Sequence, residues 1–140
     1  MFKHLRSLLP LLIILVLALA ACGSDDNGKS SSSGSFQTLT VNEAHDQLQA
    51  NPDAIFVDVR TAEEYATGHA EGTRLIPLDE IDDRAEDELP KDKDIYVICR
   101  SGNRSKSASE TLISLGYEHV YNVDGGTNAW SSAGLPMSTN

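Results

Sequence analysis

Residues 97–105 read Val-Ile-Cys-Arg-Ser-Gly-Asn-Arg-Ser, and this stretch decides how the surrounding chain is expected to fold. The apolar run over residues 95–98 predicts a buried strand that ends at Cys99. A polar loop follows, and helical spacing then predicts a helix over residues 105–115 that stops at Gly116. A strand, a loop and a helix in this order direct backbone N–H groups and a helix N-terminus at one atom. That atom is predicted to be the sulfur of Cys99.

The charges around Cys99 favour an ionised thiol. A free thiol has a pKa of about 8.5, and one pKa unit corresponds to about 1.4 kcal/mol. A helix N-terminus supplies only about 0.3–1 kcal/mol, so Arg100, Arg104 and the loop N–H groups are needed to lower the pKa further. Residues 99–106 contain three basic residues and no acid, although the whole chain has a formal charge of −10. The sequence therefore predicts a local positive site that suits a thiolate and a small anion.

The loop over residues 99–105 resembles the active-site loop of the rhodaneses, sulfurtransferases that carry sulfane sulfur as a cysteine persulfide. Other parts of the family pattern occur in order along the chain: Val57-Asp58-Val59-Arg60, Glu63-Glu64-Tyr65, Gly68-His69, Ile76-Pro77, Gly125-Gly126, Trp130 and Gly134-Leu135-Pro136. The resemblance extends over residues 36–140. This ordered set is far more specific than the loop alone, and it implies a rhodanese-like domain.

Strands and helices alternate along residues 36–140, which predicts an α/β fold with a parallel sheet flanked by helices. The predicted strands cover residues 36–39, 54–59, 73–76, 94–98 and, as the last strand, 120–123. The predicted helices begin after capping boxes at Thr40 and Thr61 and cover residues 105–115 and 127–133. The active-site loop is expected between a central strand and the following helix, at the edge of the sheet where small ligands bind.

The acid-rich stretch over residues 79–94 keeps a loose helical pattern of apolar residues. We expect a solvated helix or loop there, and an acidic docking patch is the alternative. The chain has 140 residues and no internal repeat, so we expect one domain. We also expect the protein to be a monomer. Its strongly negative charge argues against a nucleic-acid partner, because phosphate binding requires a basic surface.

The N-terminal residues 1–21 are predicted to be a targeting signal. Two basic residues precede an apolar core over residues 8–20, which is shorter than the roughly 20 residues of a membrane span. The segment Leu19-Ala20-Ala21-Cys22 resembles the lipobox of bacterial lipoproteins, so Cys22 is expected to become the lipidated first residue. An ordinary signal or an uncleaved anchor is the alternative. Several acyl chains would bind a membrane more firmly than one.

The stretch over residues 22–35 is expected to be a lipidated N-terminus followed by a flexible linker. After Cys22 it contains Gly, Ser and polar residues and no large apolar side chain. As a random coil it would reach roughly 20 Å. The domain is therefore predicted to lie outside the cytoplasm, anchored by lipid to a bacterial membrane and facing either the periplasm or the cell exterior.

The resemblance implies a covalent mechanism that requires no cofactor. Cys99 would be the nucleophile, and its thiolate would attack the outer sulfur of a donor such as thiosulfate to form a persulfide. The loop N–H groups would hold the negative charge. Arg100 and Arg104 would bind the sulfonate of the anionic donor. A thiophilic acceptor, such as cyanide, sulfite or a thiol, would then remove the sulfur.

The other loop residues, Ser101, Gly102, Asn103 and Ser105, are also expected to bind substrate. Either serine hydroxyl could donate to the sulfur or serve as a cap or turn residue, and both possibilities stay open. Gly102 is expected to supply a positive φ or a close backbone approach.

Residues elsewhere in the pattern are expected to support the site. The resemblance implies that Asp58 and Arg60 form a structural salt bridge beneath the loop, and that His69 is structural rather than a general base. No grouping of His, Cys and carboxylates has ligand spacing, so no metal site is predicted.

Two other functions compete with sulfur transfer. Cysteine-dependent phosphatases and arsenate reductases resemble this loop, but they have five residues between Cys and Arg, whereas four separate Cys99 from Arg104. The shorter ring should suit a single sulfur atom better than a tetrahedral oxyanion. The second alternative is a surface lipoprotein that binds sulfur or small anions without turnover.

Overall fold

The computed structural model describes residues 34–139. The predicted signal over residues 1–21, the lipidation site Cys22 and nearly all of the linker lie outside the described residues. Within residues 34–139, no helix is both long and apolar enough to cross a membrane.

A five-stranded parallel sheet forms the centre of the domain. Its strands are β1 (Gln37–Leu39), β2 (Ile55–Asp58), β4 (Arg74–Leu75), β5 (Ile95–Ile98) and β6 (Val120–Val123). Their order is β1-β6-β5-β2-β4, and every neighbouring pair is parallel. The predicted α/β class with a parallel sheet is therefore confirmed. Since β5 lies in the middle of the sheet, the residue that follows it emerges at the centre of the carboxyl edge.

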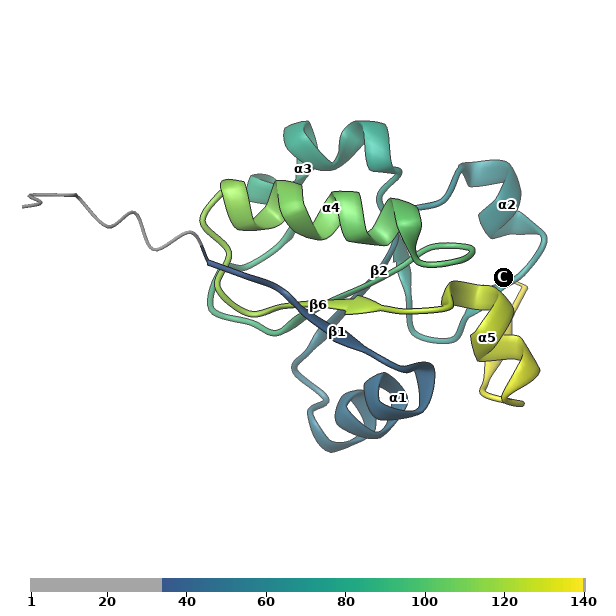
Figure 1. The fold of residues 1–140 in the computed structure, drawn as a ribbon. Coiled ribbons are helices and arrows are strands. Elements are labelled where there is room, and N and C mark those ends of the chain that lie inside the picture. The colour runs from purple at the N-terminus through teal and green to yellow at the C-terminus, as the bar shows by residue number, and fades with distance from the viewer. Residues whose placement is uncertain (1–33, 140) are drawn as a thin grey trace, which may run out of the picture.

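Helices cover both faces of the sheet (Figure 1). They are α1 (Val41–Ala50), α2 (Ala62–Ala66), α3 (Ile81–Glu88), α4 (Asn103–Ser114) and α5 (Gly126–Ser132), and a 3₁₀ turn, η1 (Leu78–Glu80), precedes α3. Figure 1 shows α3 and α4 on one face and α1 and α5 on the other. Both predicted capping boxes are confirmed, because Thr40 with Glu43 and Thr61 with Glu64 exchange hydrogen bonds at the starts of α1 and α2.

The alternation of side chains along β5 divides the core into two clusters. Ile95 and Val97 pack with residues of α3 and α4, whereas Tyr96 and Ile98 pack with residues of α1 and α5. All four are buried, as expected for a strand with helices on both faces. Cys99 continues the alternation and belongs to the cluster beneath α4.

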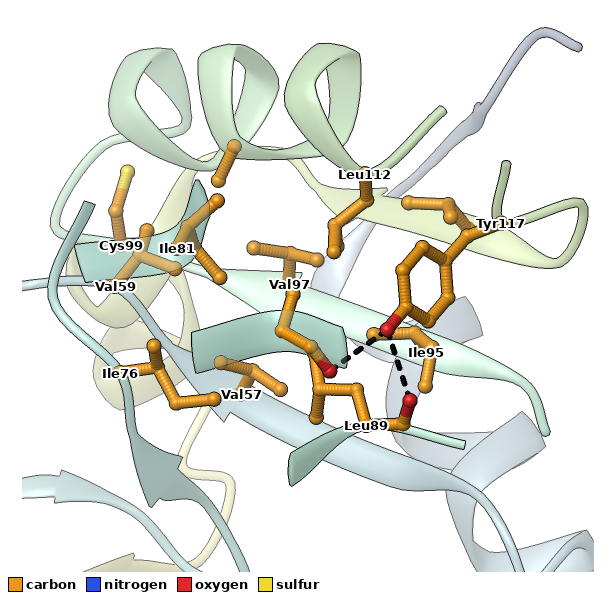
Figure 2. Packing of buried hydrophobic residues seen from close by; sticks show 13 residues of the cluster. Val57, Val59, Ile76, Ile81, Leu89, Ile95, Val97, Cys99, Leu112 and Tyr117 are labelled. Atoms are coloured by element: carbon orange, nitrogen blue, oxygen red, sulfur yellow. Dashed lines mark hydrogen bonds between the residues drawn. The ribbon is translucent and has the colours of Figure 1, made fainter. Parts of the chain in front are cut away.

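A buried tyrosine fixes α3 against the rest of this cluster. The hydroxyl of Tyr117 lies within hydrogen-bond distance of the carbonyl oxygens of Ala85, at 2.7 Å, and Leu89, at 2.8 Å, and donates its one proton to either of them (Figure 2). Cys99 lies at the opposite end of the same cluster, beside Val59 (Figure 2). The packing that sets the position of α3 and α4 therefore continues directly to the cysteine.

Two differences from the predicted elements go beyond a shift of one residue at an end. The prediction that residues 120–123 form the last strand is wrong, because β7 (Met137–Ser138) pairs antiparallel with β3 (His69–Ala70) in a small second sheet. Strands of two residues are too short to produce a recognisable alternation. The helix after the loop begins at Asn103 rather than at residue 105, because Gly102 with φ of +106° is its N-cap.

The start of α5 packs against the backbone that follows β5. The N–H of Thr127 donates to the Cys99 carbonyl at 2.7 Å, and that of Asn128 donates to the Arg100 carbonyl at 3.2 Å. Gly126 has φ of +58°, and a Cβ atom there would overlap both carbonyl groups. The close approach of the two backbones therefore requires glycine at this position.

The substitution Gly126→Ala should destabilise the domain far more than Gly134→Ala. Both glycines have positive φ, but a Cβ at Gly134 meets no atom within 4 Å. Gly134→Ala should cost about 1–2 kcal/mol of backbone strain, and the overlap at Gly126 should add about 1–3 kcal/mol. Denaturant unfolding of both variants measures the difference. Equal losses would show that the backbone contact at Cys99 is not tight.

Candidate active site

Cys99 stands at the carboxyl end of β5, with its sulfur beneath the first turn of α4. Cys99 is 1% exposed and belongs to an apolar cluster, but its sulfur atom has polar partners. The Gly102 N–H donates to Sγ at 3.0 Å, and the Ser105 hydroxyl lies 3.4 Å from Sγ. The same hydroxyl lies 3.0 Å from the Gly102 carbonyl. Since a hydroxyl has one proton, Ser105 donates to one of these acceptors at a time, and an ionised sulfur is the stronger acceptor.

The balance between burial and hydrogen bonding favours the thiolate. Burial raises the pKa of the Cys99 thiol. Hydrogen bonds lower this pKa by more, and they come from the Ser105 hydroxyl and from the N–H groups of Ser105, Gly102 and Ser101. The pKa of Cys99 therefore lies below its ordinary value. Hydrogen-bond donors close to the sulfur lower the pKa, and the apolar neighbours oppose them.

The two arginines of the loop have different surroundings. Arg100 is exposed. Arg104 forms two parallel hydrogen bonds with Glu64, from Nη1 to Oε2 and from Nη2 to Oε1, each 2.7 Å long. The hydrogen bonds from Arg104 lower the pKa of Glu64 to about 2. The sequence predicts a local positive charge in the loop. At Arg104 this charge is neutralised by the carboxylate of Glu64, which lies forty positions away in the chain.

Of the remaining loop residues, Gly102 and Ser105 reach the sulfur directly. Gly102 has the positive φ expected for it, and its N–H points at Sγ. Ser101 is exposed and contributes its backbone N–H. Asn103 is exposed and starts α4, and its carbonyl accepts the Ser107 hydroxyl at 3.4 Å. Of the two serine hydroxyls left open by the sequence, the structure thus brings that of Ser105 to the sulfur.

Asp58 and Arg60 form a buried ion pair at the carboxyl end of β2, the strand beside β5. They are 0% and 6% exposed, and Arg60 Nη2 lies 2.7 Å from Asp58 Oδ2. Arg60 also donates from Nη2 to the Gly68 carbonyl at 2.8 Å. The pair therefore ties the end of β2 to the turn that precedes β3, and the aspartate carboxylate is occupied by these bonds.

His69 is held by contacts with Tyr65. The two rings stack with centroids 3.7 Å apart, and Nδ1 lies 3.1 Å from the Tyr65 carbonyl oxygen. At 5% exposure, His69 is part of β3 in the small second sheet, where β3 packs against α2, and this is the surrounding of a structural residue. Within residues 34–139, His, Cys and carboxylates form no cluster of three or more that could hold a metal ion.

A cleft of about 310 Å³ opens beside the loop. Val59, Pro77 and Leu78 supply its apolar lining, and Arg104 and Asp79 are among its polar lining residues. Val59 belongs to the same cluster as Cys99 and lies next to it in Figure 2. The sequence predicts Glu64 as part of a capping box and contains Pro77 within its family pattern, but neither type of residue signals an ion pair with Arg104 or a cleft by itself.

Comparison with known proteins identifies similar chains and folds. Residues 40–133 match the protein family described as Rhodanese-like domain. The chain is 40% identical over 91 residues to a protein named sulfurtransferase from Allochromatium vinosum, and this match covers 65% of the chain and 84% of the relative. A rhodanese-like domain from Anabaena sp. is 30% identical with a TM-score of 0.70, over 76% of this chain and 81% of that one. A rhodanese with anions from E. coli is 33% identical with a TM-score of 0.55, over 62% of this chain and 99% of that one.

The ion pair between Glu64 and Arg104 should make the domain sensitive to acid. The pKa of Glu64 falls from its ordinary value of 4.5 to about 2 in the folded state. Its contribution to stability is therefore fully present above pH 4.5 and is lost as the pH falls toward 2. We expect Glu64→Gln to have a lower melting temperature at neutral pH and a shallower decline in acid than the wild type.

Circular dichroism melting curves recorded from about pH 6 to about pH 2.5 measure this difference. This range starts above the ordinary pKa of Glu64, 4.5, and extends toward its pKa of about 2 in the folded state. Glu63→Gln is the control, since Glu63 is an exposed residue in the same helix. It should retain the wild-type slope. If Glu64→Gln also retains that slope, the ion pair contributes nothing to stability.

Proposed function

The chain belongs to the rhodanese-like domain family, and from this premise we propose that it is a sulfurtransferase in which Cys99 carries the transferred sulfur as a persulfide. The observation that carries the proposal is the 3.0 Å hydrogen bond from the Gly102 N–H to Sγ, within a loop that lowers the pKa of the thiol. A reactive thiolate is the first requirement for attack on sulfane sulfur.

In the first step the Cys99 thiolate attacks the outer sulfur of a donor such as thiosulfate. A new S–S bond forms at Sγ while the S–S bond of thiosulfate breaks, and sulfite leaves with the electron pair of that bond. The products are a persulfide anion on Cys99 and one sulfite dianion, so charge and atoms balance. Arg100 is the exposed loop cation that would bind the sulfonate during this step.

In the second step an acceptor attacks the outer sulfur of the persulfide. Cyanide, sulfite or a thiolate forms a bond to that sulfur, and the electron pair of the broken S–S bond returns to Sγ. The loop N–H groups and the Ser105 hydroxyl, which surround the thiolate, would also stabilise the charge that returns there. The sulfur is carried by Cys99 itself, so the cycle uses no separate cofactor.

The geometry supports sulfur transfer over phosphate chemistry. A phosphatase loop needs its arginine to bind the oxygens of a tetrahedral anion. In this domain the fork of Arg104 is occupied by two hydrogen bonds with Glu64. The sulfur is instead approached by individual donors from Gly102 and Ser105, an arrangement suited to one charged atom.

We also propose where the enzyme works. The lipobox-like segment that ends at Cys22 and the linker that follows it support a lipid-anchored protein outside the cytoplasm. There Cys99 would meet donors and acceptors near a bacterial membrane, as a monomer whose partners are small sulfur compounds.

Incubation of the full chain with thiosulfate should add one sulfur atom at Cys99. Peptide mass spectrometry locates the sulfur, and addition of cyanide should release it. Cys99→Ser keeps Cys22 and should gain no sulfur at position 99. Hydrolysis of an aryl phosphate without sulfur gain would instead establish a phosphatase, and the absence of both reactions would leave a binding protein.

The substitution Arg100→Ala should raise the KM for thiosulfate about tenfold, since a hydrogen bond to a charged group contributes about 1.5–3 kcal/mol and some of it is retained by water. Steady-state thiosulfate:cyanide assays measure this change. Lys93→Ala removes a positive charge before the opposite end of β5 and should leave KM unchanged. An unchanged KM for Arg100→Ala would remove the role assigned to Arg100.

A further inference from the structure

The carboxylate of Glu64 is fixed by two elements at once. Its Oε2 accepts the Thr61 N–H at 3.1 Å, which closes the capping box of α2. Both carboxylate oxygens also accept from Arg104, in the first turn of α4. Glu64 is about one third exposed, as is Arg104, so the pair lies at the rim of the site and not deep in the core.

This pairing changes the charge that a substrate meets. A guanidinium that already forms two parallel hydrogen bonds with a carboxylate offers little net charge to another anion. Asp79 adds a second carboxylate at the cleft, whose other lining includes the apolar side chains of Val59 and Leu78. Arg100 is the other cation of the loop, and within residues 34–139 no acidic side chain forms an ion pair with it.

We propose that Glu64 is a specificity-determining residue, which by holding Arg104 makes the site prefer sulfur carriers of low charge, namely organic thiols and their persulfides, over the dianions thiosulfate and sulfite. This inference rests on the proposed function and names its preferred substrate class. The acceptor would approach through the cleft that Val59 and Arg104 line, and its thiolate would attack the outer sulfur of the Cys99 persulfide. The S–S bond to Sγ breaks, its electron pair returns to Cys99, and the product is the acceptor's persulfide.

The substitution Glu64→Gln separates the charge of Glu64 from its capping role. A capping box accepts Gln as well as Glu, so Glu64→Gln retains the acceptor for the Thr61 N–H and removes the charge. The chain provides a matched control in its other capping box, where Glu43 Oε2 accepts the Thr40 N–H at 2.9 Å. Glu43→Gln makes the same chemical change at α1, on the other face of the sheet from α4 (Figure 1).

The test compares a neutral and an anionic reagent of similar size at the same sulfur. Cys99 is alkylated in the full chain with iodoacetamide and with iodoacetate, and peptide mass spectrometry measures both rates at Cys99. A change in thiol pKa alters both rates equally, so their ratio reports the charge of the site. The wild type should favour iodoacetamide. Glu64→Gln should shift the ratio toward iodoacetate about tenfold, the effect of one released charge-assisted hydrogen bond partly screened by solvent.

Two further variants make the interpretation specific. Glu43→Gln should keep the wild-type ratio. Glu64→Asp keeps the negative charge, so it should stay close to the wild type even where the shorter side chain weakens the cap. An unchanged ratio in Glu64→Gln would overturn the proposal, and so would an equal shift in Glu64→Asp or a failure of Cys99 to react with either reagent.

A second arm uses the persulfidated enzyme with 2-mercaptoethanol and 2-mercaptoethanesulfonate, a neutral and an anionic thiol. Transfer to the sulfonate relative to the neutral thiol should rise about tenfold in Glu64→Gln, by the same release of Arg104. A shifted alkylation ratio without any persulfide on Cys99 would refute the sulfurtransferase function while retaining Glu64 as a filter against anions. A normal persulfide with unshifted ratios in both arms would refute the role of Glu64 alone.

Discussion

The structure depends on one hydrogen-bonding arrangement, in which donors of a short loop converge on a sulfur at the end of a buried strand. Burial alone would keep Cys99 neutral, since a charged group loses hydration when apolar side chains surround it. The N–H of Gly102 at 3.0 Å and the hydroxyl of Ser105 oppose this effect, and the pKa of the thiol falls below its ordinary value. The same cysteine is therefore both a member of a hydrophobic cluster and a thiol whose pKa lies below its ordinary value. A small displacement of the loop would remove the donors but leave the apolar neighbours in place.

The position of that loop is set by the neighbouring strand as well as by its own sequence. Gly102 passes so close to the turn after β6 that a Cβ atom would lie 3.0 Å from Asp124 Oδ1. The first turn of α5, which directly follows that turn, donates from Thr127 and Asn128 to the carbonyls of Cys99 and Arg100. Two βα connections at the carboxyl edge thus brace each other, with glycines where their backbones meet. This is the edge at which parallel α/β sheets bind small molecules.

Local signals made much of this domain predictable from the sequence. Strand β6 spans the predicted residues 120–123, and both capping boxes form where Thr and Glu are three positions apart. Such local signals could not predict contacts between segments that are distant in the sequence. The pairing of Glu64 with Arg104 spans forty positions, and β3 pairs with β7 through only two residues in each strand. The sequence also could not decide whether the hydroxyl of Ser101 or that of Ser105 reaches the sulfur, because this depends on where α4 begins relative to Sγ.

The overall charge of the protein acts in the same direction as Glu64. A chain with a formal charge of −10 repels a dianion at long range twice as strongly as a monoanion. Salt reduces this repulsion beyond a screening length of about 8 Å at physiological ionic strength, so the final selection occurs within the site itself. There, in the proposal made above, the pairing of Arg104 with Glu64 decides how well a second negative charge is tolerated, and solvent at the rim screens this effect in part. Long-range and local electrostatics therefore disfavour highly charged donors independently, and only the local part can be altered by a single side chain.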